Sequence, residues 1–294
     1  MHDQADRLRR LVLGEAAEGL APAAPAPPLV TVLGGKGGVG ATTIAVNLAV
    51  AIARHGRRVV LVDANLQQPD IATQCRLEDK DTLTDVLDGR RTVHEVLQRG
   101  PAGIQVLPGA WAANRVAECS EPAQKRLLKE LARLGPHTDM VVLDGGCGLN
   151  PTAQRFAQAS DLLLMVTTAE SVSIMDCYAT VKSLSGGPSH SGSPSLPPIQ
   201  TVVNQSSDEK ADDDVHDRIA QACRRFLGLE IQKAATISSD ASIASAIDQQ
   251  TPLMVSDQNS SAAQQIERLA QHLVAFCNQH KLAPSRSRPW KMAS

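Results

Sequence analysis

The sequence predicts an α/β fold built on a doubly wound, mainly parallel sheet, and three observations support this prediction. Short apolar runs rich in β-branched residues alternate with amphipathic helical patterns along the 294 residues. Most of these runs are continuously apolar, which is typical of parallel strands covered on both faces. A glycine-rich stretch, LVTVLGGKGGVGATT over residues 29–43, joins the first apolar run to the first long helical pattern.

The elements follow in chain order from apolar periodicity and from residues that begin or end helices. We expect strands over residues 29–33, 59–64, 104–107, 140–143, 162–167, 199–204 and 231–237. We expect helices over residues 41–54, 82–88, 92–98, 122–134, 152–159, 171–183, 213–227, 242–249 and 262–279. The Ser-, Gly- and Pro-rich residues 183–198 predict a mobile surface loop.

Several polar residues mark element ends. Thr82 and Thr92 precede short helical patterns, and we expect both to act as N-caps. Three aspartates near other element ends are predicted to be solvated caps: Asp70, Asp240 and Asp248.

The composition predicts an aliphatic core and excludes some classes of protein. Hydrophobic residues make up 43% of the chain but aromatic residues only 2%. The formal net charge of −2 gives no electrostatic footprint for nucleic acid, so we expect no nucleic-acid partner. Six scattered cysteines without a C-x-x-C pair predict reduced thiols in a cytoplasmic protein. No apolar run reaches the ~18 residues that a membrane-spanning helix needs.

The glycine-rich stretch fits the phosphate-binding P-loop pattern G-x-x-x-x-G-K-[ST] with one departure. The pattern runs from Gly35 to Thr42, but Ala41 occupies the lysine position. In a strand–loop–helix unit, the loop N–H groups and the positive end of the helix dipole converge on one anion. The sequence therefore predicts a phosphate site at this loop.

The same stretch also fits the dinucleotide-binding pattern G-x-G-x-x-G through Gly35, Gly37 and Gly40. Asp63 follows about 20 residues later, as that fold requires. An NAD-dependent oxidoreductase is therefore one alternative, although it gives no role to the threonine pair after the loop or to Asp144.

The residues from Lys36 onward resemble the deviant Walker A motif of the MinD/ParA family, the dimerising P-loop ATPases of the SIMIBI class. Three further segments resemble this family's second acidic strand, its Walker B and switch II segment, and its adenine-side strand: VVLVDANL (59–66), VVLDGGCGLN (141–150) and VVNQ (202–205). Within the family, the chain is similar to the FlhG/YlxH regulators of flagellar number and placement. Its opening DQADRLR contributes to that similarity.

This resemblance implies a P-loop NTPase fold, with ATP or ADP and Mg²⁺ as cofactors and a homodimer that forms with ATP. It implies that Lys36, Asp63 and Asp144 are catalytic and that Thr42, Asp63 and Asp144 hold Mg²⁺. The implied nucleotide-binding residues are Gly35, Lys36, Gly37, Gly38, Val39, Gly40, Ala41, Thr42, Thr43 and Asn204.

Two departures from the family pattern predict slow or absent ATP hydrolysis. Ala41 lacks the ammonium group that would neutralise phosphate oxygens. Asn65 stands where the family has a water-orienting aspartate, and an amide cannot act as a base. The related pilus-localisation group TadZ/CpaE also has an Ala-Thr-Thr loop, so a pilus localiser remains an alternative, as does a ParA-like partitioning protein.

The termini complete the predicted organisation, which is a helix over residues 1–20, a Pro/Ala linker over 21–28, the nucleotide-binding domain over 29–280 and a basic tail over 281–294. By the resemblance, the first segment would contact an FlhF-like GTPase through Asp3, Gln4, Ala5, Leu8 and Arg9. The tail carries prolines and lacks an apolar face, so we expect at most weak contact with an anionic membrane surface.

Overall fold

The computed structural model describes residues 25–110, 120–148, 151–186, 196–207 and 209–281. The predicted helix and most of the linker over residues 1–28, and the tail beyond residue 281, lie outside these ranges, as does the middle of the predicted loop. Within the described ranges, no helix combines the length and the apolar character needed to cross a membrane.

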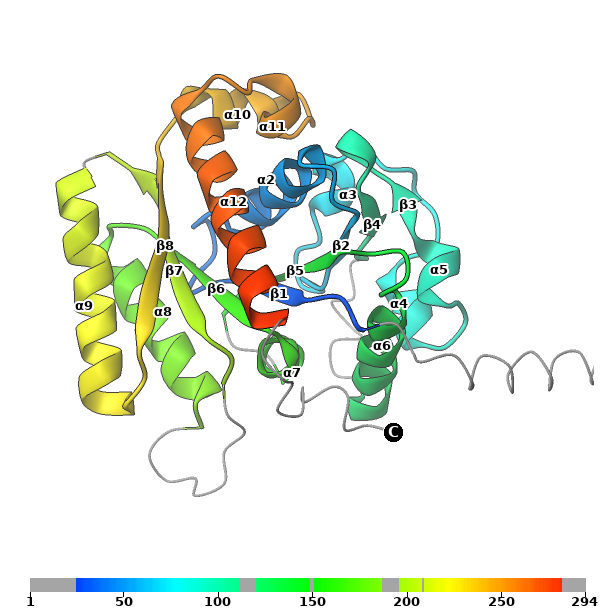
Figure 1. Ribbon diagram of the computed structural model, residues 1–294, viewed down its shortest axis with the longest axis horizontal. Coiled ribbons are helices and arrows are strands. Elements are labelled where there is room, and N and C mark those ends of the chain that lie inside the picture. The colour runs from blue at the N-terminus through cyan, green and yellow to red at the C-terminus, as the bar shows by residue number, and fades with distance from the viewer. Residues whose placement is uncertain (1–24, 111–119, 149–150, 187–195, 208, 282–294) are drawn as a thin grey trace, which may run out of the picture.

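Within the described residues, one eight-stranded sheet forms the centre of the molecule, with the order β3-β4-β2-β5-β1-β6-β7-β8 (Figure 1). Neighbouring strands are parallel throughout, except that β3 pairs with β4 in the antiparallel direction. The predicted doubly wound, mainly parallel sheet is thus confirmed. The strands are β1 (Leu29–Gly34), β2 (Val59–Asp63), β3 (Gln98–Arg99), β4 (Gln105–Leu107), β5 (Met140–Cys147), β6 (Leu162–Thr167), β7 (Ile199–Ser206) and β8 (Ile231–Ser238).

Helices cover both faces of the sheet (Figure 1). One face carries α2 (Ala41–Arg54), α3 (Ile71–Gln74), α10 (Ala241–Asp248), α11 (Leu253–Ser256) and α12 (Ser261–Lys281). The other face carries α4 (Leu83–Leu87), α5 (Val93–Val96), α6 (Glu121–Arg133), α7 (Pro151–Ala159), α8 (Ser171–Leu184) and α9 (Glu209–Leu227). A 3₁₀ turn, η1 (Pro101–Gly103), precedes β4.

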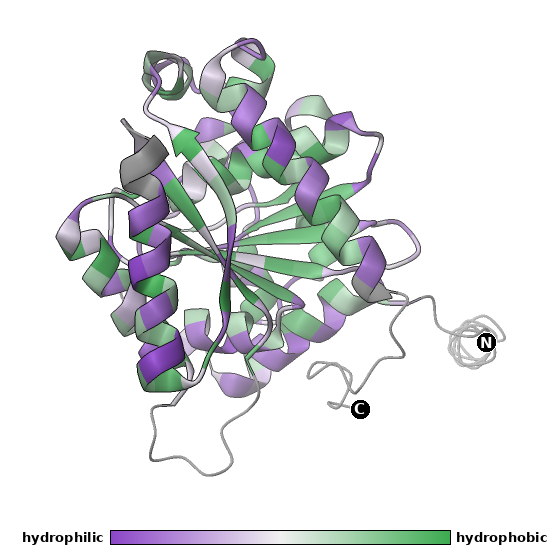
Figure 2. Ribbon diagram, turned by 60° about the vertical axis from the view of Figure 1, so that its left-hand side comes forward, coloured by the Kyte–Doolittle hydropathy of each residue, from purple (hydrophilic) through white to green (hydrophobic). Residues whose placement is uncertain are grey.

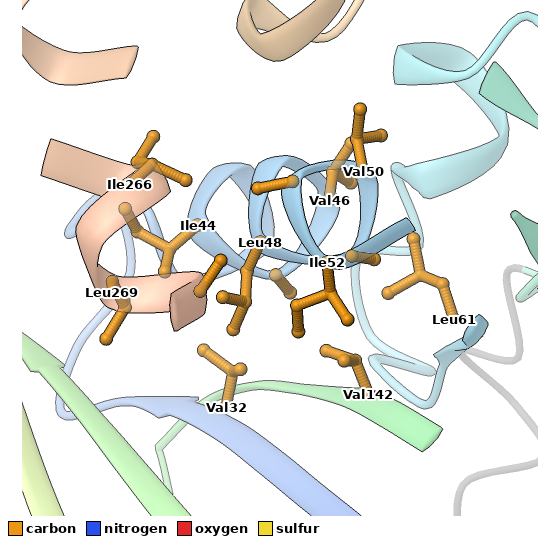
Figure 3. Packing of buried hydrophobic residues seen from close by; sticks show 14 of the residues in the cluster. Val32, Ile44, Val46, Leu48, Val50, Ile52, Leu61, Val142, Ile266 and Leu269 are labelled. Atoms are coloured by element: carbon orange, nitrogen blue, oxygen red, sulfur yellow. The ribbon is translucent and has the colours of Figure 1, made fainter. Parts of the chain in front are cut away.

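The core is aliphatic, as the low aromatic content predicts. Figure 2 shows the hydrophobic strands between helices that are hydrophilic on their outer surfaces. Ile44, Leu48 and Ile52 of α2 are at most 1% exposed; Leu48 and Ile52 point toward Val32 and Val142 of the sheet, and Ile44 lies beside Ile266 and Leu269 of α12 (Figure 3). Burial of each such side chain contributes roughly 1.5–3 kcal/mol, so α2 is held firmly at the end of β1.

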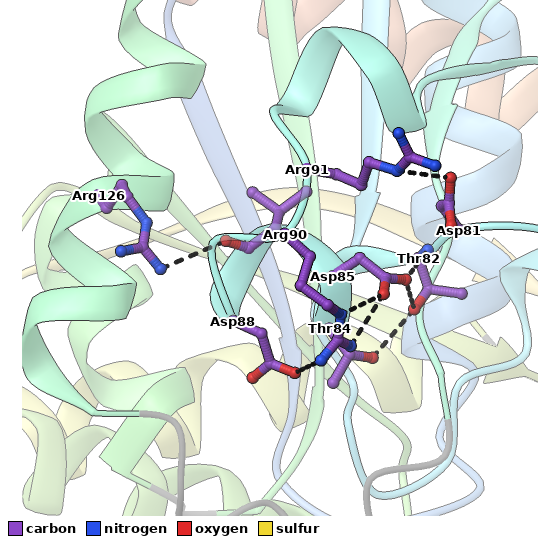
Figure 4. Close-up of polar contacts among 9 residues, drawn as sticks. Asp81, Thr82, Thr84, Asp85, Asp88, Arg90, Arg91 and Arg126 are labelled. Carbon is purple, nitrogen blue, oxygen red and sulfur yellow. Dashed lines mark hydrogen bonds and ion pairs between the residues drawn. The ribbon is translucent and has the colours of Figure 1, made fainter.

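The predicted threonine caps of two short helices are present. Thr82 and Thr92 each form a capping box with the acidic residue three positions on, Asp85 and Glu95. These boxes satisfy backbone N–H groups that have no partner within the helix. Arg126 of α6 donates to the carbonyl oxygen of the last residue of α4 and holds its other end (Figure 4).

Some short elements differ from the predictions. The predicted helix over 92–98 ends at Val96, and Gln98 instead pairs with Val106 in the edge strand β3. The two short helices α3 and α11 were not expected, because four residues are too few to show helical periodicity. β5 is longer than the predicted strand over 140–143. It continues past its apolar run as far as Cys147, where the residue pattern no longer indicates a strand.

Candidate nucleotide-binding site

A pocket of about 320 Å³ lies where β1, β2 and β5 end and α2 begins. Parallel strands bring their carboxyl ends to one edge of the sheet, and ligands of α/β folds bind outside that edge. The lining residues are Lys36, Gly37, Gly38, Val39, Gly40, Ala41, Thr42, Thr43, Asn65, Gln68, Asp70, Gln74, Gly146, Cys147, Asn204, Gln205, Ile243 and Ile247. Nine of the predicted site residues therefore share this surface with Asn65.

The glycine-rich loop is shaped by its own backbone and by two side chains from the end of β7. Gly40, the N-cap of α2, has φ 87°, a left-handed conformation that glycine adopts without strain. Asn204 donates from Nδ2 to the carbonyl oxygen of Val39 at 2.8 Å, and Gln205 donates from Nε2 to that of Gly38 at 2.9 Å. These bonds satisfy two carbonyl groups of the loop and hold it in place. The N–H groups at the start of α2 remain the natural donors to an anion.

Two aspartates lie side by side beneath the pocket. Asp63 ends β2 and stands opposite Asp144 of β5 in the parallel register, and both are fully buried. Asp63 accepts hydrogen bonds from the N–H of Asn65 at 3.2 Å and of Ile71 at 3.1 Å. Asp144 accepts one from the N–H of Gly146 at 2.9 Å through Oδ1, whereas Oδ2 is buried without a hydrogen-bond partner among the described residues.

This pair is electrostatically unfavourable when both groups are ionised. Burial, and then the charge of Asp144, hold the pKa of Asp63 well above its usual range. Burial raises the pKa of Asp144 to about 6, although the neighbouring Thr42 hydroxyl and the Gly146 amide lower it. An unpartnered buried carboxylate oxygen costs free energy unless a proton or a cation compensates it. These residues fit Mg²⁺, which prefers oxygen ligands and keeps waters and phosphate oxygens in its shell.

The Asn65 side chain forms two hydrogen bonds with the backbone of Gln68. Its Nδ2 donates to the carbonyl oxygen of Gln68 at 2.7 Å, and its Oδ1 accepts from the Gln68 N–H at 3.3 Å. A carboxylate could make only the second of these bonds. The side chain also packs closely on Gly146, where a Cβ would lie 2.5 Å from the Asn65 Cγ.

Lys36 forms an ion pair with Glu170, the N-cap residue of α8. The Lys36 side chain is 31% exposed and that of Glu170 is 67% exposed, so the pair lies at the surface, where such contacts contribute at most about 1 kcal/mol. Gly35, by contrast, is packed against the backbone of α8 at Cys177.

The residues that form this pocket lie within a known family of domains. A model of the CobQ/CobB/MinD/ParA nucleotide-binding domain matches residues 30–253. The chain belongs to the MinD/ParA family. This match confirms the resemblance on which the predictions rested, and it favours the P-loop interpretation of the glycine-rich stretch over the dinucleotide-binding one.

Relatives within the MinD/ParA family include an antiactivator and a flagellum site-determining protein. The antiactivator FleN of Pseudomonas aeruginosa is 29% identical over 243 residues, which cover 83% of this chain and 85% of FleN. The flagellum site-determining protein YlxH of Helicobacter pylori is 28% identical over 154 residues, 52% of each chain. MinD of Pyrococcus horikoshii, solved with Mg-ADP, superposes with a TM-score of 0.70 at 22% identity over 86% of this chain and 98% of that one. At that identity, the structural likeness concerns the fold alone.

Several polar residues of this MinD/ParA pocket were not predicted as site residues from the sequence. Gln68, Gln74 and Gln205 line it, and Asp70 lies at its rim rather than acting as a remote cap. Asp70 does occupy the N-cap position of α3, but its side chain makes no capping hydrogen bond. The polar residues soon after the end of β2 could have predicted Gln68 and Asp70 as pocket residues. Segments that follow parallel strands at this edge of the sheet border the ligand.

The buried aspartates predict a specific dependence of stability on pH. The pKa of Asp144 is raised from 3.8 to about 6, so its stabilising contribution is complete below pH 3.8 and is lost as the pH rises through about 6. In metal-free protein, urea unfolding between pH 5 and 8 should show a loss of roughly 1.4 kcal/mol relative to Asp144→Asn, because the rest of the effect is already lost below pH 5. A constant difference between the two proteins across this range would contradict the prediction.

Proposed function

We propose that the chain binds ATP with Mg²⁺ in this pocket and acts as a FleN- and YlxH-like regulator of flagellar number or placement. The observation that carries the proposal is the unpartnered Oδ2 of Asp144 under a glycine loop at a helix N-terminus. A buried oxygen of this kind needs a cation once it is ionised, and the loop above it suits the phosphates that such a cation accompanies. The match to the flagellum site-determining protein YlxH supports the flagellar role, and the match to FleN extends the similarity over 83% of this chain.

Different residues would bind the phosphates, the Mg²⁺ ion and the adenine. The backbone of Gly37 to Thr42 would cradle the phosphates, and the Thr42 hydroxyl with Asp63 and Asp144 would hold Mg²⁺, directly or through water. Mg²⁺ supplies charge neutralisation on the phosphate oxygens. The buried Oδ1 of Asn204 has no hydrogen-bond partner among the described residues, so it offers an acceptor for the amino group of adenine.

Turnover is expected to be slow, because Ala41 brings no positive charge to the phosphates. Ala41 is the first residue of α2, lines the pocket and is 7% exposed. Lys36 is then the basic side chain that the loop offers to the phosphates, but it forms an ion pair with Glu170. In the proposed ATP-bound homodimer, Lys36 would leave this ion pair and reach the partner's nucleotide.

Restoring the missing charge should strengthen ATP binding. We expect Ala41→Lys to raise ATP affinity by about 10-fold or more, because an ammonium group would make charge-assisted hydrogen bonds to the phosphate oxygens. Ala41→Met, which has similar length but no charge, should leave the affinity near that of the unmodified protein. Calorimetric titration compares the three proteins, and equal affinities for the Lys and Met variants would contradict the expected charge effect.

The proposal extends to partners and location. Asp3, Gln4, Ala5, Leu8 and Arg9 would contact an FlhF-like GTPase, joined to the domain by the linker over residues 21–28. The protein would work in the cytoplasm, with weak contact at the inner membrane face through its basic tail.

Deletion of the gene in its own organism tests the flagellar role. Electron microscopy should show altered number or position of flagella, corrected by the unmodified gene but not by an Asp144→Asn variant. Normal flagella together with defective pili or plasmid partitioning would favour the TadZ/CpaE-like or ParA-like alternative instead.

A further inference from the structure

Hydrolysis of ATP in this pocket needs a group that orients the attacking water, and Asn65 is poorly suited to that task. Both polar atoms of its side chain are engaged by the backbone of Gln68, at 2.7 and 3.3 Å. An amide also cannot accept a proton at neutral pH. Any base at this site must therefore come from another residue.

Asp70 lies close to the same place. It lines the pocket together with Asn65, Thr42 and Thr43, and it directly precedes Ile71, whose N–H donates to Asp63 at 3.1 Å. A carboxylate at an N-cap ordinarily bonds to the helix N–H groups. That of Asp70 does not, although it occupies this position in α3.

The Asp70 side chain is instead held by a neighbour on its own helix. Its Oδ2 accepts a hydrogen bond from Nε2 of Gln74 at 2.7 Å, and Gln74 is only 8% exposed. No described residue donates a hydrogen bond to Oδ1 of Asp70, and the residue is exposed at the pocket rim. One oxygen is thus fixed by a buried partner, and the other is available to a water molecule.

We infer that Asp70 is the catalytic base of this chain and replaces the aspartate that is absent at position 65. The inference rests on the proposed binding of ATP. In the reaction, the oxygen of a water molecule bonds to the terminal phosphorus of ATP, the bond from that phosphorus to the bridging oxygen breaks, and ADP leaves. The water gives a proton to Oδ1 of Asp70, which later returns it to solvent.

Turnover and affinity measured on the same proteins test this assignment. Asp70→Asn should lower the rate of phosphate release by at least about 10-fold, as expected for loss of a general base, while ATP affinity by calorimetry changes less than about twofold. Asp79→Asn is the matched control, since it removes the same charge from an exposed position outside this pocket. It should alter neither quantity.

A rescue experiment separates catalysis from structure. Added formate should restore part of the turnover of Asp70→Ala, because a small carboxylate can occupy the exposed rim, whereas a merely structural defect would not respond. Turnover by Asp70→Asn equal to that of the unmodified protein would overturn the assignment, as would ATP binding without any turnover by the unmodified protein. Absence of ATP binding would instead overturn the proposed function and this inference with it.

Discussion

Replacing Asp144 by asparagine should stabilise the nucleotide-free protein and abolish its response to Mg-ATP. At pH 8, the change removes one charge from the buried pair with Asp63 and should raise the free energy of unfolding by about 1–3 kcal/mol. Saturating Mg-ATP should stabilise the unmodified protein by roughly 3 kcal/mol at 100 times the Kd, and the variant by less than a third of that. Urea unfolding with and without Mg-ATP measures both effects.

Asp139 provides the matched control for this prediction. Its carboxylate pairs with Arg58, and that guanidinium lowers the pKa of Asp139 to about 2. Asp139→Asn should therefore destabilise the protein at pH 8, opposite in sign to Asp144→Asn, and should leave the Mg-ATP effect intact. Destabilisation by Asp144→Asn, or an equal Mg-ATP effect in both variants, would contradict a cation role for Asp144.

Replacing Gly35 by alanine should cause the largest loss of stability. A Cβ on Gly35 would lie 2.5 Å from the backbone nitrogen of Cys177 and 2.8 Å from its Cα, so α8 or the loop would have to move. Overpacking against side chains already costs about 1–3 kcal/mol, and backbone yields less readily. We expect the free energy of unfolding to fall by about 3 kcal/mol or more, with loss of ATP binding.

Gly38→Ala isolates the contribution of close packing. Gly38 has φ 83°, but a Cβ there would meet nothing within 4 Å. Its cost should be limited to the left-handed backbone, about 1–2 kcal/mol. Urea unfolding of both variants measures the difference. Equal decreases in the free energy of unfolding would show that close packing of α8 against Gly35 does not determine the stability of the loop.

The sequence predicted those parts of the site that lie in continuous segments. The loop from Gly35 to Thr43 and the acidic ends of two apolar strands are local patterns, and the parallel sheet then brings Asp63 and Asp144 together. Topology alone suffices for this step, because adjacent parallel strands end at the same edge.

The remaining parts of the site depend on tertiary contacts that no local pattern contains. Lys36 pairs with Glu170, which lies 134 residues later in the chain. The backbone of α8 lies so close to Gly35 that a larger residue would not fit there. Asp70 has the sequence context of an ordinary cap, and only its missing capping bond and its place on the pocket show otherwise. The short edge strand β3 was missed for a similar reason, since two residues pair only because β4 lies beside them.

Calorimetric titration of ATP into nucleotide-free protein, with and without Mg²⁺, tests most directly whether this pocket is a nucleotide site. Light scattering on the same samples reports the mass. Binding with a Kd on the order of micromolar, strengthened about 10-fold or more by Mg²⁺ and accompanied by a doubling of mass, is the expected result. Binding of NADH in place of ATP, or no heat with either nucleotide, would contradict the proposed site.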